Sequence, residues 1–266
     1  MTSRPAVGTP SDDEQETTMR RFWTMARALL LMHLRERETL FWFFVFPVGL
    51  LLLLGAAFAG PDERGGAAAW LMAGVLVQNV MAAGLNGDAA WLAGMRDRGV
   101  LTRLRAAPLP STTLVGAYLT VRLGLVLLQS ILIVGTSLAV FGVRPTWTGI
   151  APATVAVLVG AIVFLLAGQA VAAVAPTESA ANTIANMLFF PLLFLSNLVV
   201  DADAFPTWLA TIARWLPASM LVDLVRPALT TKPAVQAAWL NLAGLLGYGL
   251  LALAIVARWF RWEPRR

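Results

Sequence analysis

The residue types that carry most enzyme chemistry are scarce in this sequence of 266 residues. It contains no cysteine and a single histidine, His33, and one imidazole without a second soft ligand does not make a metal site. The only lysine, Lys232, lies in a Thr-Lys-Pro sequence, so no P-loop lysine is present to hold a nucleotide phosphate. We therefore expect no catalytic residue, no metal site and no cofactor bound by this chain.

Two ionisable residues, Asp88 and Arg122, lie within long apolar stretches. Charged groups in such stretches are functional candidates by default, because hydrocarbon does not solvate them. Both residues lie within about two turns of an expected helix end, from which a side chain can reach water. We expect them to pair with each other or to extend toward the membrane surface.

Uncharged amides in the apolar stretches are the candidates for binding a transported molecule. Amides can hold a polar head group by hydrogen bonds while apolar neighbours take its hydrocarbon part. The alternative is hydrogen bonding between helices, worth about 0.6 kcal/mol for an average pair. The candidate pathway residues are Gln78, Asn79, Asn86, Asn182, Asn186 and Asn197.

The elements that position these residues are predicted from the length of the apolar runs. From Pro145 to Thr177 the chain has 33 residues without one Asp, Glu, Lys or Arg, and the whole sequence is 58% hydrophobic and 13% charged. Soluble domains carry about 25% charged residues. A helix of about 20 apolar residues crosses a bilayer core and satisfies its own backbone hydrogen bonds. The sequence therefore predicts an all-α membrane protein.

Six membrane-spanning helices are expected in one transmembrane domain at 39–257. Proline- and glycine-containing segments separate them, and the least certain separation is at Pro176. A disordered cytoplasmic tail is expected at 1–18, an interfacial helix at 19–38 and a basic cytoplasmic tail at 258–266. The expected spans are 39–59, 68–93, 114–141, 150–175, 180–200 and 235–257.

The cationic residues predict which side of the membrane each segment faces. With the N-terminus inside, fourteen arginines lie in interior segments, against five cationic residues in exterior segments. Because inner loops carry the excess of Lys and Arg, both termini are expected in the cytoplasm. The sequence pI of about 10.9 then reflects topology, and no nucleic-acid partner is expected.

The segment 19–38 is expected to lie as an amphipathic helix in the cytoplasmic membrane interface. Its apolar residues recur at helical spacing, and Arg20, Arg27 and Arg35 are set off from them. The alternative is a cytoplasmic extension of the first span. The apolar residues are Phe22, Met25, Ala26, Leu29, Leu30 and Leu34.

The loop after the second span, residues 95–110, combines an apolar side with a cationic side. Leu101 and Leu104 form the apolar side, and Pro108 ends any helix here. A short helix of this kind can anchor in lipid, or it can insert into a groove of a soluble partner.

This loop carries a resemblance to a known family. Its string Arg-Gly-Val-Leu-x-Arg-Leu-Arg-x-x-Pro-Leu-Pro, at 98–110, resembles the coupling-helix motif of type-2 ABC transporter permeases, the membrane subunits of bacterial drug, polyketide-antibiotic and polysaccharide exporters. The chain departs from the family pattern at Asp97-Arg98, because the acidic residue common directly before the glycine stands one position earlier. Similar motifs elsewhere are Arg37-Glu38 with Phe46-Pro47, Pro206-x-Trp208-Leu209, and Asp223-x-x-Arg226.

The resemblance implies partners and a location. We expect a second permease copy, identical to the first, and two cytoplasmic ABC ATPase subunits that bind ATP and Mg. The complex would lie in a bacterial inner membrane, in contact with its lipids, and a re-entrant-like helical pair would precede the last span at 201–232. The residues expected to couple to the ATPase are Arg96, Asp97, Arg98, Leu101, Arg103, Leu104 and Arg105.

The function that follows is that of a permease for ATP-driven export of a hydrophobic or amphipathic compound, such as a drug, an antibiotic or a lipid-linked molecule. One alternative is a polysaccharide or glycolipid exporter. A membrane-embedded enzyme acting on lipid would need convergent acids, a histidine or a metal cluster at one interface, and the sequence has none. A non-transporting scaffold with the same fold is a further alternative.

Overall fold

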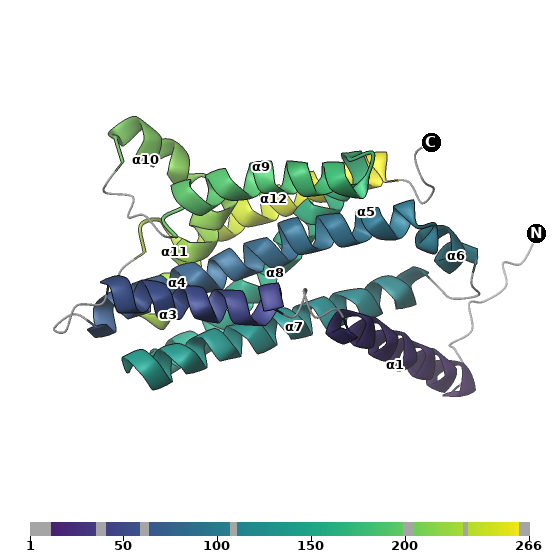
Figure 1. Ribbon diagram of the computed structural model, residues 1–266, viewed down its shortest axis with the longest axis horizontal. Coiled ribbons are helices and arrows are strands. Elements are labelled where there is room, and N and C mark those ends of the chain that lie inside the picture. Colours follow the sequence, from purple (N-terminus) through teal and green to yellow (C-terminus); the bar gives the residue numbers. More distant parts are fainter. Residues whose placement is uncertain are drawn as a thin grey trace, which may run out of the picture.

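A computed structural model describes residues 12–35, 41–58, 64–106, 111–198, 205–230 and 234–260. Every regular element within these ranges is a helix, which confirms the all-α class (Figure 1). The elements are α1 Asp12–Arg35, η1 Phe41–Val45, α3 Phe46–Phe58, α4 Arg64–Ala82, η2 Ala83–Asp88, α5 Ala89–Asp97, α6 Val100–Ala106, α7 Ser111–Phe141, α8 Trp147–Val174, α9 Glu178–Leu195, α10 Thr207–Arg214, α11 Pro217–Leu229 and α12 Ala238–Trp259.

Five helical stretches within the described residues are long and apolar enough to cross a membrane. They match the second to sixth predicted spans, and Pro176 does separate α8 from α9. Proline ends α8 here because it has no N–H and disfavours helical geometry in the residue before it. The five stretches are Gly66–Asp97, Val115–Phe141, Trp147–Val174, Glu178–Leu195 and Ala238–Trp259.

Of the first predicted span, 39–59, the structure describes residues 41–58, which are helical throughout as η1 and α3. The apolar helix within them, Phe43–Phe58, is about 24 Å long, and the residues on either side, 36–40 and 59–63, lie outside the described ranges. Before the last span, α10 and α11 form the expected helical pair, bent by 81°. By length and composition this pair would count as a sixth span, so the described residues contain five spans, or six with the bent pair.

The second span is one long helix interrupted by a π-helical segment, η2. Its sequence, Ala-Gly-Leu-Asn-Gly-Asp, is rich in residues that form α-helix poorly. Helix α8 packs against η2 through Gly168, because a Cβ at Gly168 would collide with the backbone oxygen of Gly84. Small residues at such contacts let two helix backbones approach closely in a membrane.

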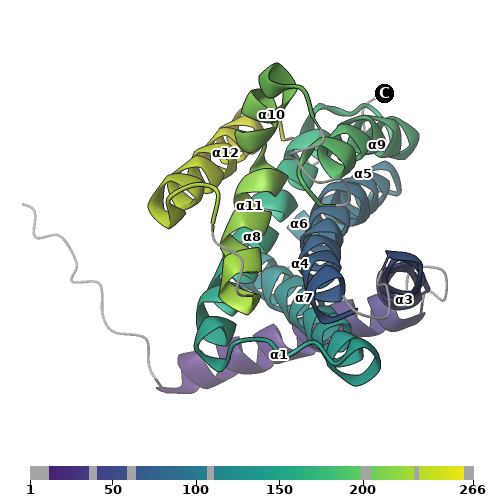
Figure 2. The same ribbon diagram turned by 90° about the vertical axis from the view of Figure 1, so that its left-hand side faces the viewer.

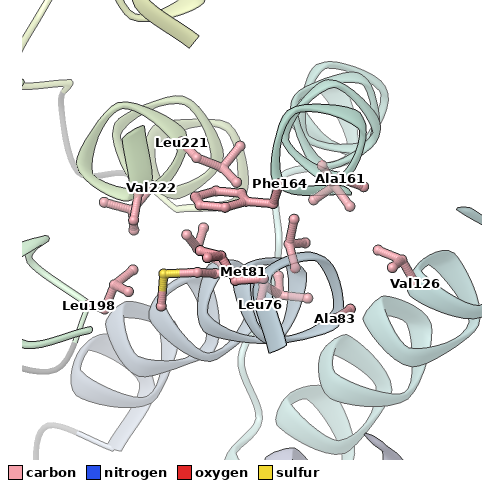
Figure 3. Packing of buried hydrophobic residues seen from close by; sticks show 14 of the residues in the cluster. Leu76, Met81, Ala83, Val126, Ala161, Phe164, Leu198, Leu221 and Val222 are labelled. Carbon is pink, nitrogen blue, oxygen red and sulfur yellow. The ribbon is translucent and has the colours of Figure 1, made fainter. Parts of the chain in front are cut away.

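The apolar core lies between the second span, α8 and α11. Figure 3 shows Phe164, Leu221 and Val222 facing Leu76 and Met81. All five side chains are buried. Helix α11 therefore packs as an integral part of the bundle, while α10 exposes Trp208 and other large apolar side chains.

Helix α1 packs along α7 rather than entering the main core (Figure 2). Ala26 and Leu29 pack against Ala117, Val121 and Leu125 of α7. Helix α1 starts at Asp12, before the predicted boundary at residue 19. The amphipathic helix is thus present, whereas its place at the membrane surface stays a prediction.

The two ends of the bundle differ. Helix α6 lies at one end, with the start of α1 and the end of α12, and α10 lies at the other (Figure 1). We call these the α6 end and the α10 end. Residues 1–11, 36–40, 107–110 and 261–266 lie outside the described ranges, and with them the Arg37-Glu38 and Pro-Leu-Pro motifs and most of the predicted tails.

Candidate functional site

The candidate site is the junction of α5 and α6 with the turn between α8 and α9, at the α6 end. Helix α5 ends at Asp97, and α6 begins at Val100 after a turn that contains Gly99. Gly99 has φ of +68°, a left-handed conformation that glycine adopts without a steric penalty. The turn lets α6 leave the axis of α5, so α6 forms the corner of the bundle (Figure 1).

Arg96 lies inside the protein, with 1% of its surface exposed. Its Nη1 donates to the carbonyl oxygen of Ala172 at 2.7 Å, and its Nη2 donates to that of Ala175 at 2.8 Å. These carbonyls belong to the last turn and the C-cap of α8, where oxygens lack partners within the helix and the dipole favours a cation. Arg96 therefore caps α8 and does not lie on the surface expected to meet an ATPase.

Asp97 caps the N-terminal end of the next helix, α9, with its negative charge. Its Oδ2 accepts a hydrogen bond of 2.8 Å from the backbone N–H of Glu178, the first residue of α9. The Thr177 hydroxyl accepts a second N–H, from Ala180, at 3.2 Å. A carboxylate at a helix N-terminus is favoured by both the free N–H groups and the helix dipole.

Arg98 forms an ion pair with Glu178, with 3.3 Å between Arg98 Nη1 and Glu178 Oε2. About half of each side chain is exposed, 59% and 46%, so this ion pair contributes little stability. Three consecutive predicted coupling residues, 96–98, thus contact the α8–α9 turn from the same chain.

Helix α6 itself presents a mixed surface. Leu101 is buried, with 4% exposed, whereas Thr102 and Arg103 are exposed. The side chains of Leu104 and Arg105 lie outside the part of the chain that is described. Among the predicted coupling residues whose side chains are described, Arg103 is exposed on α6 and takes no part in the hydrogen bonds and ion pair that hold Arg96, Asp97 and Arg98 to the α8–α9 turn.

The predicted pathway amides of one chain differ in exposure. Gln78 and Asn79 are buried on α4, with 4% and 2% exposed, and Asn86 is half-buried in η2. Asn182 and Asn186 are exposed on α9. Among the described residues, the atoms Gln78 Oε1, Asn79 Nδ2 and Asn86 Oδ1 are buried without a hydrogen-bond partner.

Asn197, the sixth candidate, follows α9 in a left-handed conformation with φ of 55°. Asparagine tolerates this region better than most residues. Its carbonyl oxygen accepts a hydrogen bond of 2.7 Å from Arg226, and the Arg226 guanidinium lies over the Trp70 ring. This places Asn197 in the anchoring of α11, with its side chain half-buried.

The expected pairing of Asp88 with Arg122 is confirmed, since Arg122 Nη2 lies 3.4 Å from Asp88 Oδ1. Both side chains are buried. Arg122 also donates to the carbonyl oxygen of Ala83 at 2.7 Å, at the start of η2. The ion pair therefore ties α7 to the π-helical segment.

His33 joins this pair, which the sequence did not indicate. Its Nδ1 donates to the Leu29 carbonyl at 2.9 Å, so its Nε2 is free to accept from Arg122 Nη1, which lies 3.4 Å away. His33 and Arg122 are 89 residues apart, and no spacing signal connects them. Among the described residues, no group of three or more His, Cys, Asp or Glu is placed to hold a metal ion.

Comparison with known proteins identifies the family of this chain. The model of the ABC-2 type transporter family matches residues 20–230. Nodulation protein J of Rhizobium leguminosarum bv. trifolii is 31% identical over 90 residues, which cover 34% of this chain and 34% of that protein. The matched segment thus spans about a third of this relative. Because the family match covers most of the sequence, the chain belongs to the ABC-2 type transporter family and is a type-2 ABC permease.

Proposed function

We propose that two identical copies of this permease form the pathway of an ATP-driven exporter in a bacterial inner membrane. The substrate would be a hydrophobic or amphipathic compound, such as a drug, an antibiotic or a lipid-linked molecule. The observation that carries the proposal is the form of α6, in which a buried Leu101 anchors the helix while Arg103 faces outward at the α6 end. A short, anchored helix at the end of a bundle suits docking into a groove of a soluble subunit.

The energy source would be a separate ATPase. The sequence has no P-loop string, so ATP and Mg would bind to two partner ATPase subunits rather than to this chain. With both termini in the cytoplasm, as the arginine distribution indicates, α6 would face those subunits. Closure of the ATPase pair would then displace α6 and shift the two permeases relative to each other.

The exposed amides of α9 support a second permease copy. Asn182 and Asn186 lie on a surface that also exposes Met187 and Phe190. Asn186 lies about 12 Å along the helix from Glu178, so lipid would leave its amide without hydrogen-bond partners. A second copy facing α9 would remove the amides from lipid and place them along a shared pathway.

A polysaccharide or glycolipid substrate is the second candidate. Its supporting observation is the same pair of amides, Asn182 and Asn186, because a row of amides can hydrogen-bond to sugar hydroxyls as well as to a drug. A transport assay with both substrate classes separates the two candidates.

Co-purification tests the ATPase contact. The tagged permease is expressed with a candidate ABC ATPase from the same genome, and the recovered ATPase is measured for wild type, Arg103→Glu and Arg144→Glu. Arg144 is the matched control, because it is an exposed arginine in the turn between α7 and α8, at the opposite end. Arg103→Glu should lower ATPase recovery about tenfold, a coupling of usual size, with membrane insertion unchanged. Equal recovery for all three proteins would refute the assignment of α6.

Transport by Asn186→Leu tests the pathway. If Asn186 contacts substrate, the variant should change substrate preference or apparent affinity while its abundance stays near that of wild type. The neighbouring Met187→Leu, also exposed, is the control. A loss of thermal stability alone, with unchanged preference, would assign the amide to helix packing.

A further inference from the structure

We propose that Arg96 and Asp97 are positioning residues that lock the base of α6 to the turn between α8 and α9, so that α6 and α9 move as one unit. We call this pair and its acceptor and donor groups the α8–α9 latch. The inference rests on the proposed function, because the motion of α6 would come from the ATPase. It assigns to Arg96 and Asp97 a role inside the permease, in place of a contact with the ATPase.

The latch joins two helix ends of opposite polarity to two side chains of opposite charge. The cation of Arg96 meets the carbonyl end of α8, and the carboxylate of Asp97 meets the N–H end of α9. Each charge is placed at the helix terminus that its sign stabilises. Because Arg96 and Asp97 are adjacent in sequence, the end of α5 holds both termini at once.

Contacts between α5 and the start of α9 reinforce the junction. A Cβ at Gly94 would lie 2.5 Å from Glu178 Oε2 and 2.8 Å from its Cδ, so the Glu178 side chain lies directly against α5. Arg96 is buried, with its Nε 3.6 Å from Asp97 Oδ1, and pulling it from the two carbonyls would break two hydrogen bonds of a buried charge. The end of α9 that carries Glu178 is therefore fastened to α5 by hydrogen bonds, charge and contact.

The connection continues into α6. Only Arg98 and Gly99 separate α5 from α6, and Arg103 N–H bonds back to the Gly99 carbonyl at 3.3 Å. Leu101 is buried, so a displacement of α6 relative to the bundle would expose its side chain. We therefore expect a displacement of α6 at Arg103 to move the α8–α9 latch with it, rather than to bend the turn between α5 and α6.

The consequence for transport lies on α9. Asn182 and Asn186 follow Glu178 by one and two turns on the same helix, and both are exposed. A displacement of the α9 start would move these amides with it. The latch would thus connect the ATPase contact to the proposed pathway without any residue that touches substrate.

The first experiment measures substrate transported per ATP hydrolysed, in vesicles that contain the permease–ATPase complex. Asp97→Ala removes the acceptor for Glu178 N–H, Asp97→Asn keeps a neutral acceptor, and Thr183→Ala is a control on the exposed surface of α9. Asp97→Ala should lower the ratio about tenfold, in the usual range of coupling between sites, and Asp97→Asn should restore most of it. A purely structural role would lower the yield of folded complex and leave the ratio unchanged, which would overturn the proposal.

The second experiment measures the α6–α9 distance directly and does not need the ATPase. Because the chain has no cysteine, spin labels can be placed at Thr102→Cys and Thr183→Cys in the permease in lipid nanodiscs. The distance distribution should be narrow in the otherwise unchanged protein and broader with Asp97→Ala. An equal width in both proteins would refute the latch.

The two experiments separate the latch from the function on which it rests. If wild-type complex moves no substrate, the proposed function fails, and the label distances still decide the latch. If wild type transports and Asp97→Ala transports equally per ATP, only the latch fails. With the full complex, ATP and Mg should change the label distance by less than about 2 Å, the size of a helix shift at an interface. A larger change would show that α6 and α9 move independently.

Discussion

At the scale of single residues, Asp88 and Arg122 form a buried ion pair in which each charge depends on the other as its counterion. The two charges lie in the second and third spans with little access to water. Removing one charge of a buried pair leaves the other without a counterion, whereas replacing both by apolar residues can be nearly neutral. Arg122 additionally donates to the Ala83 carbonyl and contacts His33. Removing Arg122 would therefore also remove contacts of α7 with η2 and α1.

The effects of the two single substitutions on the free energy of unfolding should therefore not add up in the double variant. We expect Asp88→Leu to lower the free energy of unfolding by about 3–5 kcal/mol, because Arg122 stays charged and buried. The double variant Asp88→Leu/Arg122→Leu should recover part of this loss. Thermal unfolding of the purified permease in detergent measures both, and a double variant less stable than Asp88→Leu would contradict the explanation.

Two glycines on neighbouring helices offer a matched comparison. A Cβ at Gly168 would collide with the backbone of Gly84, whereas a Cβ at Gly124 meets nothing within 4 Å. We expect Gly168→Ala to destabilise the protein by about 1–3 kcal/mol through overpacking. Gly124→Ala should be neutral or stabilise by up to about 1 kcal/mol, because alanine favours helix. Equal melting temperatures for the two variants would count against close contact of α8 with η2.

At the scale of elements, α11 and α12 are joined by Asp223. Its carboxylate accepts hydrogen bonds from the backbone N–H groups of Val235 and Gln236 and from Asn241 Nδ2, at 2.6 to 2.8 Å. Asp223 lies on α11, whereas these three donors lie in the segment that leads into α12 and on α12 itself. Asp223 thus orders the approach to the last span.

Removal of this carboxylate should loosen the start of α12. We expect Asp223→Ala to speed hydrogen exchange at the amides of Val235 and Gln236, since a hydrogen bond to a charged group is worth about 1.5–3 kcal/mol. The control Thr211→Ala removes only a bond within α10, from its hydroxyl to the Thr207 carbonyl. Hydrogen exchange followed by mass spectrometry makes the measurement. If both variants exchanged alike at 235 and 236, Asp223 would not order this segment.

At the scale of the whole molecule, the bundle has two distinct ends, and membrane topology decides what each end meets. Helix α6 and the end of α12 share one end, and the turn between α7 and α8 lies at the other (Figure 1). The arginine distribution predicts that the α6 end lies in the cytoplasm. This orientation is required if α6 is to reach a cytoplasmic ATPase.

Cysteine labelling tests this topology, because every introduced cysteine is the only one present. The exposed positions are Thr102 and Arg258 at the α6 end, and Arg144 and Val235 at the α10 end. In intact cells, a membrane-impermeant thiol reagent should label Arg144→Cys and Val235→Cys but not Thr102→Cys or Arg258→Cys. Labelling of Thr102→Cys from outside would invert the orientation and remove the basis for the ATPase contact.

The sequence by itself determined the class of the protein and most of its elements. A membrane helix can be recognised from its own residues, because nearly every one of them meets hydrocarbon or another apolar helix. The long run without charge that forms α8 is an example. Five predicted spans and the amphipathic α1 were therefore found from the apolar pattern, and the helical pair before the last span was implied by the family resemblance.

The tertiary structure alone decided what the functional candidates do. Arg96 and Arg103 are both arginines in one cationic loop, yet one caps α8 and the other is exposed. Arg96 meets Ala172 across 76 residues of sequence, and Arg122 meets His33 across 89. The amides of α4 are buried and those of α9 exposed, although both helices are apolar. Which face of a helix turns inward depends on neighbours that lie far away in sequence, so only the packed bundle determines it.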